Sequence, residues 1–373
     1  MKTETIQIMA GAAVLSAFTY VPILARDYLG ANEFYVTLLV SSYAAAMFVS
    51  SYVFGRAGDI HGRRVVLRIG LLLSTLSFAL LLIASSPESL FIIRVLNGFC
   101  IGIYPGALAA YAHESKMAMG RFATFGALGW GFGTALAGLA AGFNIYYAFA
   151  LSSLFYMMAF ATSMKLPPIE HDEMDVPLLP MKTLKQNLPV YLAILIRHSS
   201  ASAVWTLWPL LLSDLGADFF MIGIVQASNS ISQVIFMAAI TDRIGYEKLV
   251  IMGLLASAIT FAWFALVTNI LQMIPAQILL GFSWACLYVG ALRYVTDRNK
   301  EKSTASGLLQ SMMSISGVIG PIIATILYFV WPSYTPILLN AMIMSFVAFI
   351  IFTYGVRKRN AAKSGYADTG FRF

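Results

Sequence analysis

Charge is scarce in this chain, and its scarcity excludes a water-soluble globule. Of the 373 residues, 11% are Asp, Glu, Lys or Arg and 59% are hydrophobic, whereas a soluble domain carries about 25% charged residues. So few charges cannot cover the surface of a globule of this length in water. Most of the surface therefore has to contact an apolar medium.

Cysteine is nearly absent, and the usual signatures of an enzyme are missing. Cys100 and Cys286 lie deep in apolar runs without metal-ligand spacing, so we interpret them as small packing residues. The chain has no glycine-rich phosphate loop of the Walker type. Its apolar runs hold no paired carboxylates, metal cluster or nucleophile–base set. We therefore expect no cofactor, no metal and no enzymatic activity.

Basic residues outnumber acidic ones, 24 to 17, but they sit in short turns between apolar runs. This distribution is typical of loops that face the cytoplasm and not of a phosphate-binding face. The sequence therefore argues against nucleic acid as a partner.

Twelve apolar runs are long enough to cross a bilayer, which requires about 20 residues. Three longer apolar stretches divide at Gly142-Phe143-Asn144, Thr268-Asn269 and Trp331-Pro332-Ser333. The predicted spans are 6–25, 34–54, 65–86, 89–112, 122–142, 145–164, 190–213, 219–240, 249–268, 270–294, 304–329 and 333–356. The fold class is therefore an all-α polytopic membrane protein with six spans on either side of a central linker.

The charges of the loops predict the orientation in the cell membrane. With the N-terminus inside, the inner segments hold nearly all Lys and Arg residues, and the outer loops hold only Arg26. Because basic loops stay in the cytoplasm, both termini are predicted to be cytoplasmic. Residues 165–189, rich in proline and acidic residues, form the predicted cytoplasmic linker between bundles 1–164 and 190–356, and 357–373 form a cytoplasmic tail.

A polar stretch, Gly55-Arg56-Ala57-Gly58-Asp59-Ile60-His61-Gly62-Arg63-Arg64, interrupts the apolar pattern as a predicted turn. A fainter copy follows 183 residues later, with Asp242 at the position of Asp59 and Gly245 at that of Gly62. Such a repeat predicts two pseudo-symmetric six-helix halves, one way in which transporters build an alternating-access cavity.

With these motifs the chain resembles the major facilitator superfamily of secondary transporters over residues 6–356. In that family the turn between helices 2 and 3 reads roughly Gly-x-Leu-x-Asp-Arg-x-Gly-Arg-Arg; this chain has Ala57 and Ile60 at the leucine and first arginine positions. The resemblance implies that Asp59 and Arg63 latch the halves together on the inner side. The alternative is a plain solvated turn. The gate residues are Gly55, Asp59, Gly62, Arg63, Arg64, Asp242, Arg243 and Gly245.

The fourth span carries Arg94 and Asn97. Gly98, Gly102 and Gly106 follow Arg94 at intervals of four residues. These glycines form a smooth face that another helix can approach closely. The resemblance links an arginine in this span to the cavity and to coupling. Snorkelling of Arg94 to the outer surface is the alternative.

The seventh span places Arg197, Trp205 and Trp208 on one helical face, beside His198. We interpret this face as a site for an anion or an aromatic solute, with snorkelling of Arg197 as the alternative. His198 is a candidate proton carrier, although a helix-to-helix hydrogen bond is the plainer interpretation.

Other polar and aromatic residues within the spans are candidates for the cavity, because such groups favour a bundle interior. They are Gln226, Asn229, Gln277, Trp284 and Tyr288. No Asp or Glu lies within the core of a span, which favours a neutral or anionic solute over a cation exchanged for a proton on a buried carboxylate.

The sequence thus predicts a secondary transporter that moves a small organic solute through the bilayer by alternating access, with a coupling proton or ion as an open option. One alternative is an exporter of hydrophobic drugs; another, from a different class, is a non-transporting receptor with the same fold. Because each chain contains both halves, we expect the monomer to function.

Overall fold

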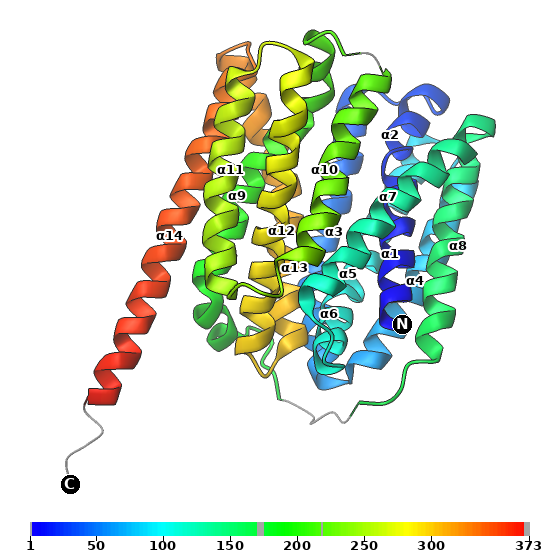
Figure 1. Ribbon diagram of the computed structural model, residues 1–373. Helices are drawn as coiled ribbons and strands as arrows, with labels where there is room; N and C mark the ends of the chain where they lie inside the picture. The colour runs from blue at the N-terminus through cyan, green and yellow to red at the C-terminus, as the bar shows by residue number, and fades with distance from the viewer. Residues whose placement is uncertain (1, 170–174, 218, 369–373) are drawn as a thin grey trace.

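The computed structural model describes residues 2–169, 175–217 and 219–368, and within them the chain is helical with short connections and no strand (Figure 1). The first half contains α1 (Lys2–Phe18), α2 (Val21–Ile23), η1 (Leu24–Tyr28), α3 (Glu33–Ile60), α4 (Arg63–Ala79), η2 (Leu80–Ile83), α5 (Pro87–Ile103), α6 (Pro105–Glu114), α7 (Met119–Phe143) and α8 (Ile145–Met164). The second half contains α9 (Met181–Asp214), α10 (Phe219–Ala239), α11 (Tyr246–Leu266), η3 (Ile270–Gln272), α12 (Met273–Arg298), α13 (Lys302–Val330) and α14 (Thr335–Asp368).

These helices account for the predicted spans. Ten segments of the described residues are long and apolar enough to cross a membrane, and α9 and α10, of 34 and 21 residues, correspond to the seventh and eighth predicted spans. Large apolar side chains such as Phe329 and Phe143 are 89% and 87% exposed, as expected of groups that contact lipid.

The three predicted breaks are confirmed, and each has a local cause. Asn144 ends α7 and accepts a hydrogen bond from the backbone N–H of Tyr146 at the start of α8. Asn269 similarly accepts from the backbone N–H of Gln272. Pro332 lies between α13 and α14, where its missing N–H costs no helical hydrogen bond.

The predicted ten-residue turn at 55–64 is wrong in extent. α3 continues through Ile60, so only His61 and Gly62 separate it from α4. Gly62 has φ +90°, a conformation that glycine adopts readily. Gly55 and Gly58 are helical instead, and both lie where α3 packs closely against α13, Gly55 beside Gly307 and Gly58 beside Ser303.

Helix α9 begins at Met181, so residues 181–189 of the predicted linker form the first turns of the seventh span. Residues 170–174, which contain much of the linker's acidic charge, lie outside the described residues. At the other end of the chain, α14 continues through Asp368 into the predicted tail.

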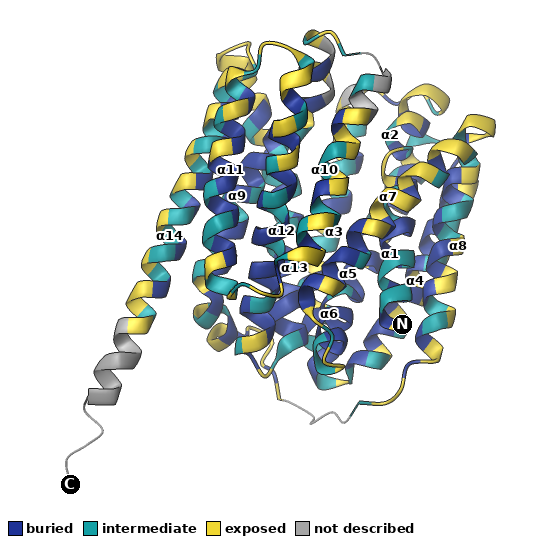
Figure 2. Cartoon of the chain, viewed as in Figure 1, coloured by how far each residue is buried: buried dark blue, intermediate teal, exposed yellow. Residues whose placement is uncertain are grey.

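The two halves pack side by side. In the first half α1 packs against α7 and α8, and α3 against α5; in the second, α9 packs against α13 and α14, and α11 against α12. Between the halves α3 contacts α13 and α7 contacts α10. Buried residues line the helix faces that point inward, whereas exposed ones gather on the periphery (Figure 2).

The N-terminus lies at the same end of the molecule as the α3–α4 turn, the end of α8 and the C-terminal end of α14 (Figure 1). Lys2 Nζ donates to the carbonyl of Lys165 at 2.6 Å, which joins the first residues to the end of α8. We call this end of the molecule, which holds Lys2, Lys165 and the α3–α4 turn, the basic end.

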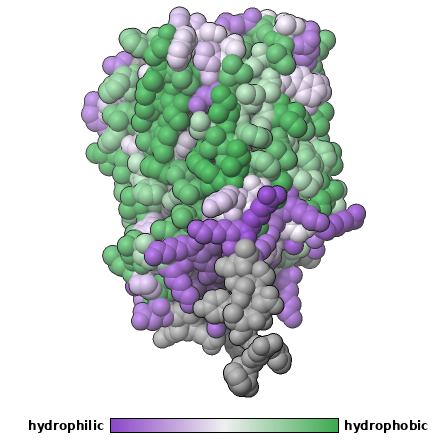
Figure 3. All heavy atoms as spheres, turned by 90° about the vertical axis from the view of Figure 1, so that its left-hand side faces the viewer, coloured by the Kyte–Doolittle hydropathy of each residue, from purple (hydrophilic) through white to green (hydrophobic). Residues whose placement is uncertain are grey.

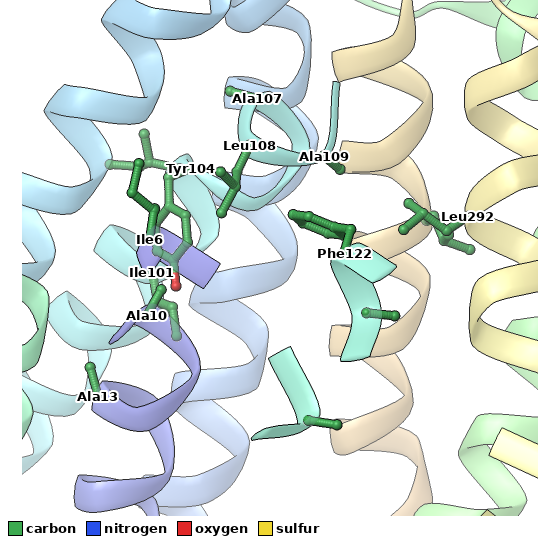
Figure 4. Packing of buried hydrophobic residues seen from close by; sticks show 14 of the residues in the cluster. Ile6, Ala10, Ala13, Ile101, Tyr104, Ala107, Leu108, Ala109, Phe122 and Leu292 are labelled. Carbon is green, nitrogen blue, oxygen red and sulfur yellow. The ribbon is translucent and has the colours of Figure 1, made fainter. Parts of the chain in front are cut away.

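Buried apolar residues join the halves into one core cluster. Phe122 of α7 lies near Ala109 of α6 and Leu292 of α12 in this cluster (Figure 4). The core therefore crosses the boundary between the halves at this level.

Candidate functional site

Asp59 links the halves at the basic end. Its carboxylate is fully buried and accepts hydrogen bonds from the backbone N–H groups of Ser303 and Thr304, at 3.1 and 2.7 Å, and from the Thr304 hydroxyl at 2.7 Å. These donors open α13, so the charge also lies at the positive end of that helix dipole. The last turn of α3 therefore caps a helix of the other half.

Arg63 supports this carboxylate from within the first half. Its guanidinium donates to Asp59 Oδ1 at 3.0 Å and pairs with Glu114 at the end of α6. Arg63 is 5% exposed, so the plain solvated turn does not describe this residue. This hydrogen bond and this ion pair both lie within the first half, so Asp59, and not Arg63, forms the hydrogen bonds across the boundary here.

Asp242 makes the corresponding contact in the opposite direction. Its carboxylate accepts from the backbone N–H groups of Gly120 and Arg121, at 2.8 and 3.2 Å, at the start of α7. Each copy of the repeated motif thus caps a helix of the other half. Arg243 is exposed, and Gly245 has φ −61° and precedes α11, so it does not repeat the conformation of Gly62.

Glycines bring the helices of the two halves into backbone contact beside Asp59. A Cβ on Gly55 would lie 2.9 Å from Gly307 Cα, and one on Gly106 would lie 2.8 Å from the Ser303 carbonyl. Farther from the repeat, His113 Nε2 lies 2.8 Å from Asp297 Oδ1 across the same boundary. Hydrogen bonds and backbone packing together hold the basic end closed.

A cavity of about 340 Å³ lies between the halves, and we call it the central cavity. Its walls are largely apolar and aromatic and come from α1, α3, α5, α6, α7, α12 and α13. The polar or aromatic lining residues include Gln7, Tyr43, Tyr104, Trp130, Tyr288 and Gln310.

A second cavity of about 300 Å³ lies in the second half, and we call it the Arg197 cavity. It brings together most of the span residues predicted for a site, which come from α9, α10 and α12. They are Arg197, His198, Trp205, Trp208, Gln226, Asn229, Gln277 and Trp284, joined by Gln233 and Leu280. No Asp or Glu is among the described residues that line either cavity.

Arg197 is 2% exposed, so it does not snorkel to the membrane surface. Its Nε donates to Ser257 Oγ at 2.9 Å, and Ser257 Oγ lies 2.6 Å from Ser283 Oγ. Its guanidinium carbon lies 5.5 Å from the ring centroids of Phe261 and Trp284, a cation–π arrangement. The cation is therefore held in a fixed position without an acidic partner among the described residues.

Five buried polar atoms of this lining have no hydrogen-bond partner in the described part of the chain. They are Arg197 Nη2, His198 Nδ1, Trp208 Nε1 and both amide atoms of Gln277. Buried polar groups are normally satisfied by protein, water or ligand. Because two of these atoms belong to obligate donors, the guanidinium and the indole, the cavity suits a group with acceptor oxygens.

Three stacked rings connect the two cavities. His198 stacks on Trp284 with centroids 5.2 Å apart, and Trp284 stacks on Tyr288 at 5.5 Å. Tyr288, predicted with the same set, lines the central cavity instead of the Arg197 cavity.

Arg94 and Asn97 line neither cavity. The Arg94 guanidinium carbon lies 4.0 Å from the Tyr43 ring centroid, and its side chain is 2% exposed, so snorkelling does not occur there either. Asn97 Nδ2 donates to the Ser77 carbonyl at 2.7 Å, which joins α5 to α4. Both residues pack inside the first half.

Sequence reasoning did not assign a role to Ser257 and Ser283 or to Tyr43, Trp130 and Gln7. The serines are ordinary in apolar helices, where a hydroxyl bonds its own backbone, so sequence gives no signal for them. The aromatic and amide residues do stand out in aliphatic spans, and that contrast is the available signal.

Two linked six-helix halves around a central cavity define a multi-pass membrane transporter of the alternating-access class. The sequence profile of the Major Facilitator Superfamily matches residues 5–182 and 190–371, and the chain belongs to this superfamily, whose members are transporters and not enzymes.

Curated relatives are resistance and efflux proteins. The chain is 24% identical to the class B tetracycline resistance protein of Escherichia coli over 334 residues, 82% of each chain. It is 24% identical to the multi-drug resistance efflux pump PmrA of Streptococcus pneumoniae over 341 residues, 84% of this chain and 85% of that one. The crystal structure of the human organic anion transporter MFSD10 (TETRAN) shares the fold, with a TM-score of 0.74, 15% identity and coverage of 94% and 99%.

Proposed function

We propose that this chain exports an aromatic organic solute that carries an anionic or oxygen-rich polar group. The observation that carries the proposal is the set of unpartnered buried atoms around Arg197. A carboxylate or enolate oxygen of the solute accepts from Arg197 Nη2 and Trp208 Nε1, and its ring packs against the indoles. In this proposal the basic end faces the cytoplasm.

Export is favoured by the relatives, which include tetracycline resistance proteins and multi-drug efflux pumps. Alternating access supplies the mechanism: the basic end opens to admit the solute and closes again on the contacts of Asp59 and Asp242. Arg197 supplies a fixed positive charge in a low-dielectric site, where electrostatic attraction is stronger than in water.

A second candidate function is export of hydrophobic compounds without an anionic group. The apolar, aromatic lining of the central cavity favours it. In this case binding depends on Trp130, Tyr43 and Tyr288 and not on Arg197.

The test is a thermal-shift screen of the purified protein with aromatic anions, neutral aromatics and hydrophobic cations, on the parent, Arg197→Gln and Arg197→Lys. A ligand at 100 times its Kd stabilises the folded state by about 2.7 kcal/mol. We expect aromatic anions to stabilise the parent, Arg197→Lys to keep part of the effect, and Arg197→Gln to lose it. Tyr354→Phe, on the exposed face of α14, is the control.

The ligands that bind are then tested for flux in proteoliposomes, which separates a transporter from a receptor. If hydrophobic cations stabilise best and Arg197→Gln binds them as the parent does, the anion proposal is wrong and the second candidate holds. Binding without flux in any gradient would contradict transport itself.

A further inference from the structure

We propose that a cleft at the basic end of the second half binds the phosphodiester headgroup of an anionic phospholipid. The cleft has a volume of about 760 Å³ and lies between α9, α11, α12 and α14, on the outside of the bundle and apart from both cavities. Four basic side chains line it: Lys185, Arg298, Lys358 and Arg359. The inference does not depend on which solute is transported.

Most of this positive charge is not neutralised by the protein. Arg359 pairs with Glu247 and donates to the Tyr294 hydroxyl at 2.5 Å. Lys185 and Lys358 are exposed, and their side chains have no hydrogen bond or ion pair with another described residue. Lys185, Lys358 and Arg298 therefore remain available to bind an anionic ligand.

Arg298 shows a feature that general surface charge does not explain. Its guanidinium carbon lies 4.3 Å from the ring centroid of Tyr294, which fixes the side chain against the bundle. Its Nη1 is buried and has no hydrogen-bond partner among the described residues. A phosphate oxygen is a suitable acceptor, because guanidinium groups bind phosphate through paired N–H donors.

The remaining walls favour a lipid over free phosphate. Leu188 and Pro189 line the cleft beside the cations, and Leu188 is 40% exposed. Above it the outer face of α14 carries Ile350 and Tyr354, which are 50% and 67% exposed. Figure 3 shows a hydrophilic band crossing the lower part of this side of the molecule, directly beneath a broad hydrophobic face.

This arrangement places positive charge at the boundary between the hydrocarbon layer and water. Basic pockets between membrane helices on the cytoplasmic side are suited to anionic headgroups. A phospholipid can bind its phosphate to Arg298 while its acyl chains lie along α14. Under the proposed orientation the lipid belongs to the inner leaflet.

The experiment measures binding of phosphatidylglycerol to the detergent-purified full chain by native mass spectrometry and by thermal shift. Phosphatidylcholine and inorganic phosphate are the comparison probes. The variants are Arg298→Gln, Lys358→Gln and Lys185→Gln. The matched control is Arg357→Gln, because Arg357 is an exposed cation on the same turn of α14 that does not line the cleft.

We expect phosphatidylglycerol to bind and stabilise the parent more than phosphatidylcholine or phosphate does. Each lysine variant should weaken its Kd about fivefold, the effect of one basic residue near an anionic surface, and Arg298→Gln should weaken it at least as much. Arg357→Gln should bind as the parent does.

Three results would overturn the proposal. Equal losses in Arg357→Gln and Lys358→Gln would assign the binding to diffuse surface charge. An equal shift with inorganic phosphate would assign the cleft to a free anion, and no preference for phosphatidylglycerol would remove the site. If Arg298→Gln does not fold, the Kd values of Lys185→Gln and Lys358→Gln, compared with that of Arg357→Gln, decide between these outcomes.

Discussion

Trp284 and Tyr288 stack with ring centroids 5.5 Å apart and planes 15° apart, and each lines a different cavity. They lie one helical turn apart on α12, and His198 also stacks on Trp284 with centroids 5.2 Å apart, so Trp284 is the middle ring of a three-ring stack in the wall of the Arg197 cavity. Tyr288 therefore holds Trp284 in the position in which it lines the Arg197 cavity.

Replacing Tyr288 with leucine should weaken binding of an aromatic solute roughly two- to tenfold, because an aromatic pair contributes about 0.5–1.5 kcal/mol beyond its buried area. Tyr288→Phe keeps the ring and should bind as the parent does. The measurement is the Kd by isothermal titration. Equal losses in the leucine and phenylalanine variants would show that the hydroxyl, and not the stack, is what matters.

Asp59→Asn should loosen the basic end. The carboxylate accepts two backbone N–H groups and a hydroxyl from α13, and hydrogen bonds to a charged group contribute about 1.5–3 kcal/mol each. We expect faster hydrogen exchange of the amides of Ser303 and Thr304, measured by mass spectrometry of that peptide.

Asp27→Asn is the control for this change, because Asp27 is exposed and hydrogen-bonded to its neighbour Arg26. Unchanged exchange at the start of α13 in Asp59→Asn would mean that the carboxylate does not hold the halves together.

Gly120→Ala should break the hydrogen bonds between Asp242 and the start of α7 without altering the charge of the protein. A Cβ there would lie 2.2 Å from Thr241 Oγ1 and 2.6 Å from Asp242 Oδ2, so the Asp242 carboxylate must move and give up its hydrogen bonds. Gly142→Ala is matched, because a Cβ on Gly142, also in α7, meets nothing within 4 Å.

The measurement for Gly120→Ala uses a single reporter, Ala109→Cys, in a Cys100→Ala, Cys286→Ala background. Ala109 lines the central cavity and is 4% exposed. Opening of the basic end should speed its reaction with an impermeant maleimide in inverted membrane vesicles at least severalfold, as expected when a hydrogen bond of about 1–3 kcal/mol is lost. A labelling rate equal to that of the Gly142→Ala variant would show that the Asp242 contact does not hold the basic end closed.

Helical spacing was sufficient to find most of the Arg197 cavity. Arg197, Trp205 and Trp208 share one face of α9, and Gln226 and Asn229 share one face of α10, so periodicity alone grouped them. It could not show which helices face each other, and Tyr288 therefore proved to line the other cavity.

Partners on distant helices explain the remaining differences. As an intramembrane charge Arg94 is predicted to reach the cavity, but it packs instead on the ring of Tyr43, which lies on α3, far away in sequence. The sequence predicts a turn at Gly55, because glycine in a polar stretch indicates a turn as readily as it indicates a close helix contact. Only the position of Gly307 distinguishes the two.

Ser257→Ala tests whether Arg197 must be held in place. Removing Ser257 Oγ leaves Arg197 Nε without its 2.9 Å hydrogen bond. It also removes the 2.6 Å hydrogen bond between the Ser257 and Ser283 hydroxyls. The guanidinium then loses its fixed direction toward the cavity. We expect the Kd for an aromatic anion to rise about fivefold or more, the equivalent of one net hydrogen bond of about 1 kcal/mol, while the Kd for a neutral aromatic changes little.

Ser345→Ala is the matched control, because Ser345 is also fully buried and its hydroxyl donates only within its own helix, to the Ala341 carbonyl at 2.7 Å. It should leave both Kd values unchanged. A parallel loss of anion and neutral binding in Ser257→Ala would indicate a general packing defect. A selective loss of the anion would instead show that Arg197 recognises the charge only when Ser257 positions it.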